Sequence, residues 1–453
     1  MIYDLIILGG GPAGYLAAER AGKAGLKVLV IEKDNMGGVC LNEGCIPTKT
    51  LLYSAKIADS AAHGEKYGVK ANVLLDHAVV MKRKNKVVKK LTGGVRASMK
   101  ALGVEIIKAF GIIKGQSADG YTVDANDTEY IAKRLLIATG SSPVVPPIPG
   151  VDTGLKSGAV LTSTEALALT EVPKSFVVIG GGVIGLEMAG YFNSAGATVT
   201  VIEMLDKIGG SIDDDIAKKL QSNLEKKGIS FKLGCKVTKI DNGKVFFEAN
   251  GEIDSVDGDK VLLSIGRRAN TAGIGLENIG VVTEHGAIPT DEYQKTNVPE
   301  VYAAGDVDGQ SMLAHTAYRE AEVAVNNMLG EHDSMRYTAV PAVIYTNPEV
   351  AGVGMTEAMA KEKGMDVTVK TVNMNYSGRY MAENEGGDGV IKIVVDNQSN
   401  KLIGVHMIAN YASEIIYGAG LMVEREMTVN EIKKIIFPHP TVGEIIREAI
   451  FQL

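Results

Sequence analysis

Two copies of one glycine-rich unit, spaced by a constant offset, constrain the fold of this chain more than any other feature. The first, Tyr3–Lys33, reads YDLIILGGGPAGYLAAERAGKAGLKVLVIEK, and the second, Ser175–Met204, reads SFVVIGGGVIGLEMAGYFNSAGATVTVIEM. Each runs from an apolar strand through a glycine loop into a helix of small residues, and then into a second apolar strand that ends at a glutamate. The loops and the glutamates share the same offset of 171 residues. This repetition predicts two doubly wound α/β domains that bind nucleotides.

The glycines of both units follow the pattern G-x-G-x-x-G. They are Gly9, Gly11 and Gly14 in the first unit and Gly180, Gly182 and Gly185 in the second. The first glycine of such a loop makes a tight turn, the second lets the backbone approach a pyrophosphate, and the third lets the helix pack on the strand. The N–H groups at the helix N-terminus then attract the phosphates. Glu32 and Glu203, each 18 residues beyond the third glycine, are expected to accept hydrogen bonds from ribose hydroxyls. The alternative in both places is a structural turn that tolerates glycine.

Glu203 bears on the choice between NAD and NADP. A 2′-phosphate would bring negative charge against this carboxylate, and the surrounding string VIEMLDK contains no arginine that could accommodate it. The second unit is therefore predicted to prefer NAD.

The length and the repeat spacing predict three domains, because 453 residues suffice for about three domains of ordinary size. We assign 1–144 together with 267–333 to a discontinuous first nucleotide-binding domain, 145–266 to the second, and 334–453 to a C-terminal α+β domain without a glycine fingerprint. The predicted class is thus α/β, with two doubly wound domains followed by an α+β domain.

Local patterns fill in the segments between and after the repeats. A helical region is expected at about 48–100, short strands at 104–137 and a helix from His315 to about Leu329. Prolines in SSPVVPPIPG, Ser141–Gly150, predict a linker, because proline interrupts both helices and strand ladders. The basic run Met81–Lys100 is expected to be a solvated helix face, with docking to an acidic partner domain as the alternative.

Composition excludes several classes of partner. The net charge of −7 argues against nucleic acid or an anionic membrane as the main partner. No apolar stretch reaches the about 18 residues of a membrane span. The opening MIYDLIILGGG lacks a basic leading region and enters a glycine loop instead of a cleavage site. We therefore expect a cytoplasmic protein, and we expect no metal site.

The strongest local signal is GGVCLNEGCIPTK, Gly37–Lys49. Two of the three cysteines, Cys40 and Cys45, lie close together in it, and in a cytosolic protein such a pair is more often redox-active than structural. A helix start with local distortion can bring two Cα atoms within reach of a disulfide, and Pro47 suits the first turn of the helix that follows. Two buried, inert cysteines are the alternative. Cys235, in FKLGCKV, is interpreted as a strand residue.

This string resembles the active-site signature of the pyridine nucleotide–disulfide oxidoreductase family, GGxCxNxGCxPxK, and the likeness extends over essentially the whole chain. The resemblance implies a homodimeric flavoprotein that reoxidises protein-bound dihydrolipoamide through a Cys40–Cys45 disulfide and FAD, passing hydride to NAD. It implies that Cys40 exchanges with dihydrolipoamide and that Cys45 faces the flavin. It also implies that Lys49 lies near the flavin, paired with Glu187 of VIGLEM. Spacing alone leaves open an ordinary helix lysine and an ordinary helix glutamate.

The resemblance assigns further cofactor contacts. Thr139 and Gly140 in LLIATGS, and Asp306 in YAAGDV, match contacts to FAD, and the aspartate suits ribityl hydroxyls. Weaker matches are Gly111 and Ala314 for FAD and Val237 and Gly266 for NAD. The chain departs from the common family pattern in a short EKDNMGGVC stretch and in HTAYREA, both of which concern peripheral FAD contacts.

The segment FPHPTVGEIIREA, Phe437–Ala449, supplies a candidate base. Thiol exchange needs a proton acceptor, because the thiolate is the attacking species. An imidazole suits this role at neutral pH, and a carboxylate on its second nitrogen fixes the tautomer. The segment resembles the family's HPTxxE motif, in which the histidine and glutamate serve the disulfide of the other subunit. His439 and Glu444 would fill these roles here, and the C-terminal domain would form the dimer interface.

Four rival functions compete with this prediction. Glutathione reductase favours NADP, which Glu203 opposes, and mercuric reductase carries a C-terminal cysteine pair, whereas no cysteine follows Cys235. A soluble transhydrogenase would lack the Cys40–Cys45 pair. A flavin-bearing structural subunit is opposed by the intact cysteine and His–Glu sets. Because the first strand begins at Ile2, the lipoyl group is expected on another protein, of a 2-oxo acid dehydrogenase or glycine cleavage complex.

Overall fold

The computed structural model describes residues 2–453, which form two compact units. The first unit comprises residues 2–50, Val79–Val144 and Gly266–Arg336, and the second comprises Leu51–Ala78, Val145–Ile265 and Tyr337–Leu453. Each unit contains one of the two glycine loops. Among residues 2–453 no helix is long and apolar enough to cross a membrane, and no cluster of side chains suited to a metal ion is found.

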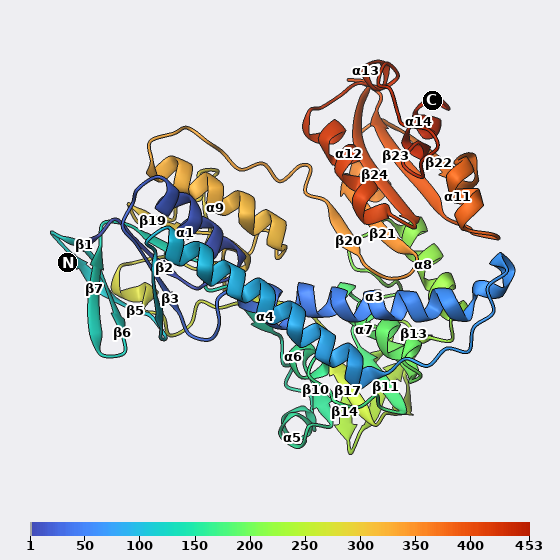
Figure 1. The fold of residues 1–453 in the computed structure, drawn as a ribbon, viewed down its shortest axis with the longest axis horizontal. Helices are drawn as coiled ribbons and strands as arrows, with labels where there is room; N and C mark the ends of the chain where they lie inside the picture. The colour runs from blue at the N-terminus through green and yellow to red at the C-terminus, as the bar shows by residue number, and fades with distance from the viewer. Residues whose placement is uncertain (1) are drawn as a thin grey trace. The chain divides into compact units, whose positions relative to one another are not determined.

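A parallel five-stranded sheet forms the centre of the first unit. Its strand order is β19-β8-β2-β3-β4, with bounds Val301–Ala303, Leu135–Ile137, Leu5–Leu8, Val28–Glu32 and Glu105–Lys108. Every residue of β2, β3 and β8 is buried, as expected for parallel strands covered on both faces. The helices α1 (Pro12–Lys23) and α9 (Ala314–Met328) pack side by side, and alanines on the buried face of α1 permit a close approach (Figure 1).

The first unit also contains a smaller sheet and three helices. The sheet has the order β1-β7-β6-β5, with bounds Ile2–Tyr3, Thr128–Ala132, Gly120–Ala125 and Ile112–Ser117. The helices are α2 (Gly38–Glu43), the first turns of α3 (Cys45–Ala62) and most of α4 (His77–Ala101). The single first strand expected from the sequence divides at Asp4, because β1 pairs with β7 whereas β2 pairs with β3 and β8.

The second unit begins with its own parallel sheet, of order β10-β17-β11-β12-β13. The strands are Val160–Leu161, Lys260–Leu263, Ser175–Ile179, Thr198–Ile202 and Ser230–Lys232. The helix α7 (Val183–Ser194) packs on β11 and β12, and α8 (Asp214–Lys226) comes next with Asp213 as its N-cap. An antiparallel meander of β14 (Lys236–Asp241), β15 (Lys244–Ala249) and β16 (Glu252–Asp257) is inserted before β17.

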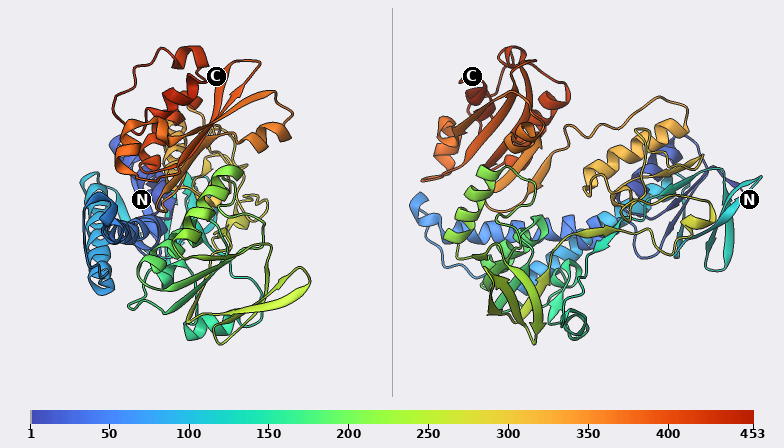
Figure 2. Two further views of the ribbon diagram at one scale, coloured as in Figure 1. Left: turned by 90° about the vertical axis from the view of Figure 1, so that its right-hand side faces the viewer. Right: turned by 180° about the vertical axis from the view of Figure 1, so that it is seen from behind.

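The C-terminal part of the second unit is an antiparallel sheet with helices, drawn in orange and red in Figure 2. Its order is β20-β21-β24-β23-β22, with bounds Ala342–Ile344, Glu349–Gly354, Lys401–Ala409, Val390–Asp396 and Val367–Asn373. The helix α12 (Ala412–Glu424) packs on β21 and β24, and α14 (Ile445–Ile450) packs on β22 and β23. One hydrophobic core joins these elements.

The predicted α/β class, with two parallel sheets of the nucleotide-binding type and an antiparallel C-terminal domain, is confirmed. Two local predictions need correction. The helical region expected at 48–100 is two helices, α3 and α4, with a 3-10 turn at Gly64–Tyr67 between them. The predicted linker begins as a short strand, β9 (Ser141–Pro143), which pairs with β18 (Arg267–Ala269); Pro143 is tolerated because it is the last residue of this two-stranded ladder.

Candidate active site

The first glycine loop connects β2 to α1 in a backbone path that only glycine can follow. Gly9 has a φ of +107°, and a Cβ there would lie 2.2 Å from the carbonyl oxygen of Ala138. A Cβ at Gly14 would lie 1.9 Å from the carbonyl oxygen of Gly9. Gly11 is the N-cap of α1, and Pro12 at the first helical position suits a helix start. The loop therefore holds the N-terminus of α1 directly against the end of β2.

Glu32 closes this loop from the end of β3. One carboxylate oxygen accepts the backbone N–H of Gly10 at 2.6 Å, and the other accepts that of Asp34 at 2.7 Å. The side chain is buried, with 9% of its surface exposed. Each carboxylate oxygen has a further lone pair for a ribose hydroxyl. The residue thus ties the loop to the sheet, a contact that the sequence did not reveal.

The second glycine loop repeats this arrangement between β11 and α7. Gly180 has a φ of +105°, and a Cβ at Gly185 would lie 2.2 Å from the carbonyl oxygen of Gly180. Gly182 is the N-cap of α7. Glu203, one residue beyond β12, accepts the N–H of Gly181 at 2.6 Å and that of Leu205 at 2.8 Å. The two loops therefore share both their steric need for glycine and their glutamate contact.

The cysteine pair lies at a break between two helices. Gly44 separates α2 from α3 with φ −141° and ψ −111°, and a Cβ there would lie 2.9 Å from the carbonyl oxygen of Val39. The Thr48 hydroxyl and N–H both reach the Gly44 carbonyl, at 2.6 and 3.1 Å, and fix the start of α3. Cys40 lies in α2 and Cys45 is the first residue of α3. The distortion expected from the sequence is thus located at Gly44.

The structure describes the pair as two half-buried thiols joined by a hydrogen bond. This bond from Cys40 to the sulfur of Cys45, together with burial, raises the pKa of the Cys40 thiol well above its usual value, and the charge of Lys49 opposes the effect. A thiol that donates to its neighbour keeps its proton, so we expect Cys45 to carry the negative charge of a singly ionised pair.

Backbone contacts place this pair beside the first glycine loop. The N–H of Gly37 donates to the carbonyl of Gly10 at 2.7 Å. A Cβ at Gly38 would lie 2.6 Å from the Cα of Gly11, and both Gly37 and Gly38 have positive φ. The two glycines ahead of Cys40 are therefore needed for the N-terminus of α2 to pack on the loop.

Two tyrosines near the sulfurs were not foreseen from the sequence. Tyr15 of α1 and Tyr318 of α9 join their hydroxyls in a hydrogen bond, with their rings edge to face at 5.9 Å. Burial raises the pKa of both hydroxyls, and the nearby cysteine pair raises them further. The signal available beforehand was the departure HTAYREA, in which Tyr318 lies.

The predicted FAD contacts Thr139, Gly140 and Asp306 lie in the first unit around one short ladder. The Thr139 hydroxyl donates to the carbonyl of Asn270 at 2.7 Å, and Gly140 has a φ of +69°. Asp306 accepts a hydrogen bond from Ser141, whose hydroxyl oxygen also accepts from Arg267 at 2.7 Å. Ser141 and Arg267 were missed, because they act on Asp306 through β9 and β18.

The remaining predicted contacts are dispersed over both units. Gly111 lies after β4, where a Cβ would lie 2.6 Å from Leu8, and Ala314 is the first residue of α9. Gly266, with a φ of +120°, belongs to the first unit, and Val237 packs in a core of the second. Any contact of Val237 with NAD would therefore use its backbone.

Glu187 is buried in α7, with 3% of its surface exposed. Its carboxylate accepts the backbone N–H of Tyr345 at 3.0 Å, which links α7 to the segment after β20. Lys49 belongs to the first unit and Glu187 to the second, so their pairing stays a prediction.

His439 and Glu444 form a pair ahead of α14. Nδ1 of His439 lies 2.7 Å from a carboxylate oxygen of Glu444. The imidazole is 77% exposed, whereas the carboxylate is only 9% exposed. The backbone N–H of Glu444 donates to the Thr441 hydroxyl oxygen at 3.1 Å, which holds the start of the helix in place. A held Nδ1 leaves Nε2 free to take a proton at the exposed edge of the ring.

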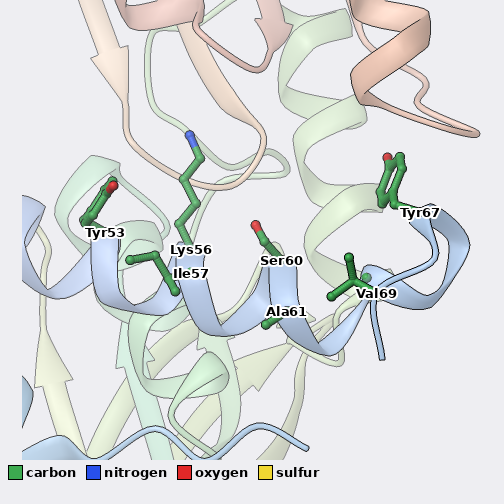
Figure 3. Close-up of a pocket in the computed structure, with 8 residues that line it drawn as sticks. Tyr53, Lys56, Ile57, Ser60, Ala61, Tyr67 and Val69 are labelled. Atoms are coloured by element: carbon green, nitrogen blue, oxygen red, sulfur yellow. The ribbon is translucent and has the colours of Figure 1, made fainter. Parts of the chain in front are cut away.

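A separate open pocket of about 440 Å³ lies in the second unit. It is lined by Tyr53, Lys56, Ile57, Ser60, Ala61, Gly64, Tyr67 and Val69. Figure 3 shows Lys56, Ser60 and Tyr67 pointing to the same side of α3. None of the predicted site residues lines it.

Comparison with known proteins gives a consistent result over the whole chain. The family model for pyridine nucleotide-disulphide oxidoreductases matches residues 3–321, and the model for the dimerisation domain of the same family matches residues 340–450. A dihydrolipoyl dehydrogenase of Mycoplasma genitalium is 41% identical over 461 residues, covering 100% of this chain and 99% of that protein. One of Bacillus subtilis is 41% identical over 464 residues, covering 99% and 97%.

Two solved structures superimpose on the chain over nearly its whole length. LpdA from Mycobacterium tuberculosis superimposes with a TM-score of 0.90 at 26% identity, over 99% of each chain. The HOCl-induced flavoprotein disulfide reductase RclA from Escherichia coli superimposes with a TM-score of 0.87 at 28% identity, over 100% of each chain.

Proposed function

The chain belongs to the pyridine nucleotide-disulphide oxidoreductase family and, within it, to the dihydrolipoyl dehydrogenases, and on that premise we propose that its Cys40–Cys45 pair oxidises dihydrolipoamide with FAD and NAD as cofactors. The observation that carries the proposal is the packing of this pair on the first glycine loop, through Gly37 and Gly38. A dithiol there is within reach of a nucleotide cofactor at the loop.

The exchange chemistry follows from the asymmetry of the two sulfurs. In the oxidised pair, a dihydrolipoamide thiolate attacks Cys40, the Cys40–Cys45 bond breaks, and Cys45 leaves as the thiolate. The second substrate thiolate then attacks the substrate sulfur bound to Cys40, which closes the lipoamide ring and releases Cys40. Cys40 takes a proton and can donate it in the hydrogen bond that joins the two sulfurs. Two electrons have moved from the substrate to the cysteine pair.

His439 is the proposed base for the two substrate thiols, and Glu444 is its positioning residue. The carboxylate at 2.7 Å favours the tautomer with the proton on Nδ1, so that Nε2 accepts. The exposure of the imidazole supports a role toward another subunit. We propose a homodimer in which each His439–Glu444 pair serves the cysteine pair of the other chain; the dimerisation domain matched at 340–450 supports this.

The residues of both loops fit dinucleotides. FAD would be held at the first loop by Gly9, Gly11, Gly14, Glu32, Lys49, Gly111, Thr139, Gly140, Asp306 and Ala314. NAD would be held at the second by Gly180, Gly182, Gly185, Glu203, Val237 and Gly266. Both fits rest on the positive φ of the first glycine and on the open space beside the second, because a Cβ at Gly182 would meet nothing within 4 Å and one at Gly11 only the Cα of Gly38 at 3.9 Å. When bound, FAD supplies an acceptor for the two electrons of the dithiol, and NAD supplies an acceptor for hydride.

We also propose a domain division, a partner and a cellular location. The proposed domain division is 1–144 with 267–333, 145–266 and 334–453. Breaks between the compact units at 144/145, 265/266 and 336/337 lie near three of its boundaries, whereas residues 51–78 belong to the second unit, which also holds both 145–265 and 337–453. The partner is a lipoyl-bearing protein of a 2-oxo acid dehydrogenase or glycine cleavage complex. The proposed location is the cytoplasm.

Alkylation of the thiols tests the proposal directly. The purified protein is mixed without oxygen with one equivalent of dihydrolipoamide, quenched with iodoacetamide, and mapped by peptide mass spectrometry. We expect alkylation of Cys40 and Cys45 to rise from near zero, while buried Cys235 stays constant as the internal control. Unchanged labelling of the pair would contradict the proposal.

A further inference from the structure

The turn that carries Asp306 is fastened at both ends to buried carboxyl groups. The N–H of Gly305, just before the turn, donates to Glu320 of α9 at 2.6 Å. The N–H of Gln310, just after it, donates to Oδ1 of Asp308 at 2.9 Å. Glu320 is fully buried and Asp308 is 4% exposed.

These two carboxyl groups also contact each other. Glu320 and Asp308 are joined by a side-chain hydrogen bond, yet Oδ2 of Asp308 has no donor among the described groups. Two ionised carboxylates are acceptors only and cannot make such a bond, whereas one proton between them provides the missing donor. Repulsion between two like charges in a buried site also disfavours ionisation of both groups.

We propose that Asp308 and Glu320 share one proton, and that Asp308 is a positioning residue whose acid form holds the turn that presents Asp306 to FAD. The inference rests on the proposed function, because it takes Asp306 as a flavin contact. The Ser141 hydroxyl donates to the Asp306 carboxylate, so a turn that does not move keeps Asp306 within hydrogen-bond distance of Ser141.

The charged groups around Asp308 and Glu320 favour keeping one proton on the pair. Glu320 comes from α9 and Asp306 from the turn itself. The strand β18 also packs on the turn, and its Arg267 faces Asp306 at 3.9 Å, while Arg268 is exposed. Burial, followed by the charge of Glu320, raises the pKa of Asp308 to about 8.

The sign of the pH dependence follows from the raised pKa. The unfolded chain releases the Asp308 proton near the usual pKa of 3.8, whereas the folded chain keeps it until about 8. Between these values the folded state binds more protons, so the free energy of unfolding falls as pH rises. Above about pH 8 the pair is doubly charged and the turn loosens.

The variant Asp308→Asn tests this, because the amide can donate to Glu320 at every pH. We expect its Tm to match the wild type at pH 5 and to exceed it by about 4 °C at pH 9. The apparent Kd for FAD should rise about tenfold from pH 6 to pH 9 in the wild type and less than about twofold in the variant. Glu320→Gln offers the same permanent donor from the other side of the pair.

Asp333→Asn is the matched control in the same unit. Arg319 holds the pKa of Asp333 below its usual value, with Nη1 at 2.7 Å from the carboxylate. Its loss should lower Tm at pH 7 to 9 and less at low pH, opposite in sign to Asp308→Asn.

If the Tm profiles of the wild type, Asp308→Asn and Glu320→Gln ran parallel from pH 5 to 9, the proposal of a shared proton would be overturned. If both variants raised Tm at pH 9 but the wild type bound FAD equally well at every pH, the positioning role of Asp308 would be overturned. If the wild type bound no FAD at any pH, the proposed function would fail, and the Tm profiles alone would still decide whether the proton is shared.

Discussion

The two glycine-loop units agree in their hydrogen bonds and differ in the segments that come after them. In the first, Gly10 donates to Glu32, and in the second, Gly181 donates to Glu203, both at 2.6 Å. In each unit the chain then returns to the loop. Gly37 donates to the carbonyl of Gly10 at 2.7 Å, and Gly209 donates to that of Gly181 at 2.8 Å.

After this return the paths separate. The first continues into α2 and the cysteine pair, whereas the second reaches Asp213 and α8. At the repeat position of Leu16 in α1, the second unit has the buried Glu187 in α7. The proposed nucleotide binding thus depends on features that the two units share, and the proposed thiol chemistry depends on the segment that follows the first unit.

The largest effect is expected when the thiol of Cys40 is removed. Cys40→Ser should reduce dihydrolipoamide oxidation on the order of 10³-fold, because a hydroxyl cannot form the mixed disulfide. FAD content and Tm should stay unchanged, since the shared loop is untouched. The control is Cys235→Ser, at a cysteine outside both loops; turnover that survives in Cys40→Ser would refute the assignment.

A smaller loss is expected at the base. His439→Ala should lower dihydrolipoamide turnover on the order of 10²-fold and leave NADH reduction of small dyes largely intact, because only the thiol step needs the base. Equal losses of both activities would show that His439 is not the base of the thiol step.

Mixed dimers test where that base acts. A hybrid of one Cys40→Ser subunit and one His439→Ala subunit contains one complete site if the pairs serve each other across the dimer. It should recover about half of the wild-type turnover, whereas a base acting within its own chain predicts an inactive hybrid.

An alanine in place of the third glycine tests which cofactor each loop binds. Gly185→Ala should raise the KM for NAD about 10- to 50-fold and preserve FAD, because the added Cβ meets the Gly180 carbonyl at 2.2 Å. Gly14→Ala should instead lower FAD content. Loss of the same cofactor in both variants would show that the two loops do not bind different cofactors.

The smallest effect concerns the choice of cofactor. Glu203→Gln should reduce the ratio of kcat/KM for NAD to that for NADP about tenfold, since the repelling charge is lost. Glu32→Gln, the equivalent change in the first unit, should leave this ratio unaltered. A wild type with equal kcat/KM for both cofactors would show that Glu203 does not discriminate.

Features that depend on neighbours in the chain were predictable. The glycines that need a positive φ, the apolar strands and the placement of Pro47 in the first turn of α3 all follow from local sequence. The class of fold follows from the repeat, because parallel strands joined by helices must be covered on both faces.

Contacts between distant segments were not predictable. The Tyr15–Tyr318 bond joins residues 303 positions apart, and the glutamates that close both loops bind backbone groups 22 positions away. The division of the first strand at Asp4 arises from pairing with β7, which no local pattern specifies. Such features are set by packing, which one sequence does not display.

Formation of NADH from dihydrolipoamide and NAD by the purified wild-type protein decides whether the cysteine pair, FAD and NAD act together as proposed. We expect turnover of about 1–10³ s⁻¹, with a higher kcat/KM for NAD than for NADP. A protein that contains FAD and reduces dyes with NADH, yet forms no NADH from dihydrolipoamide, would contradict it.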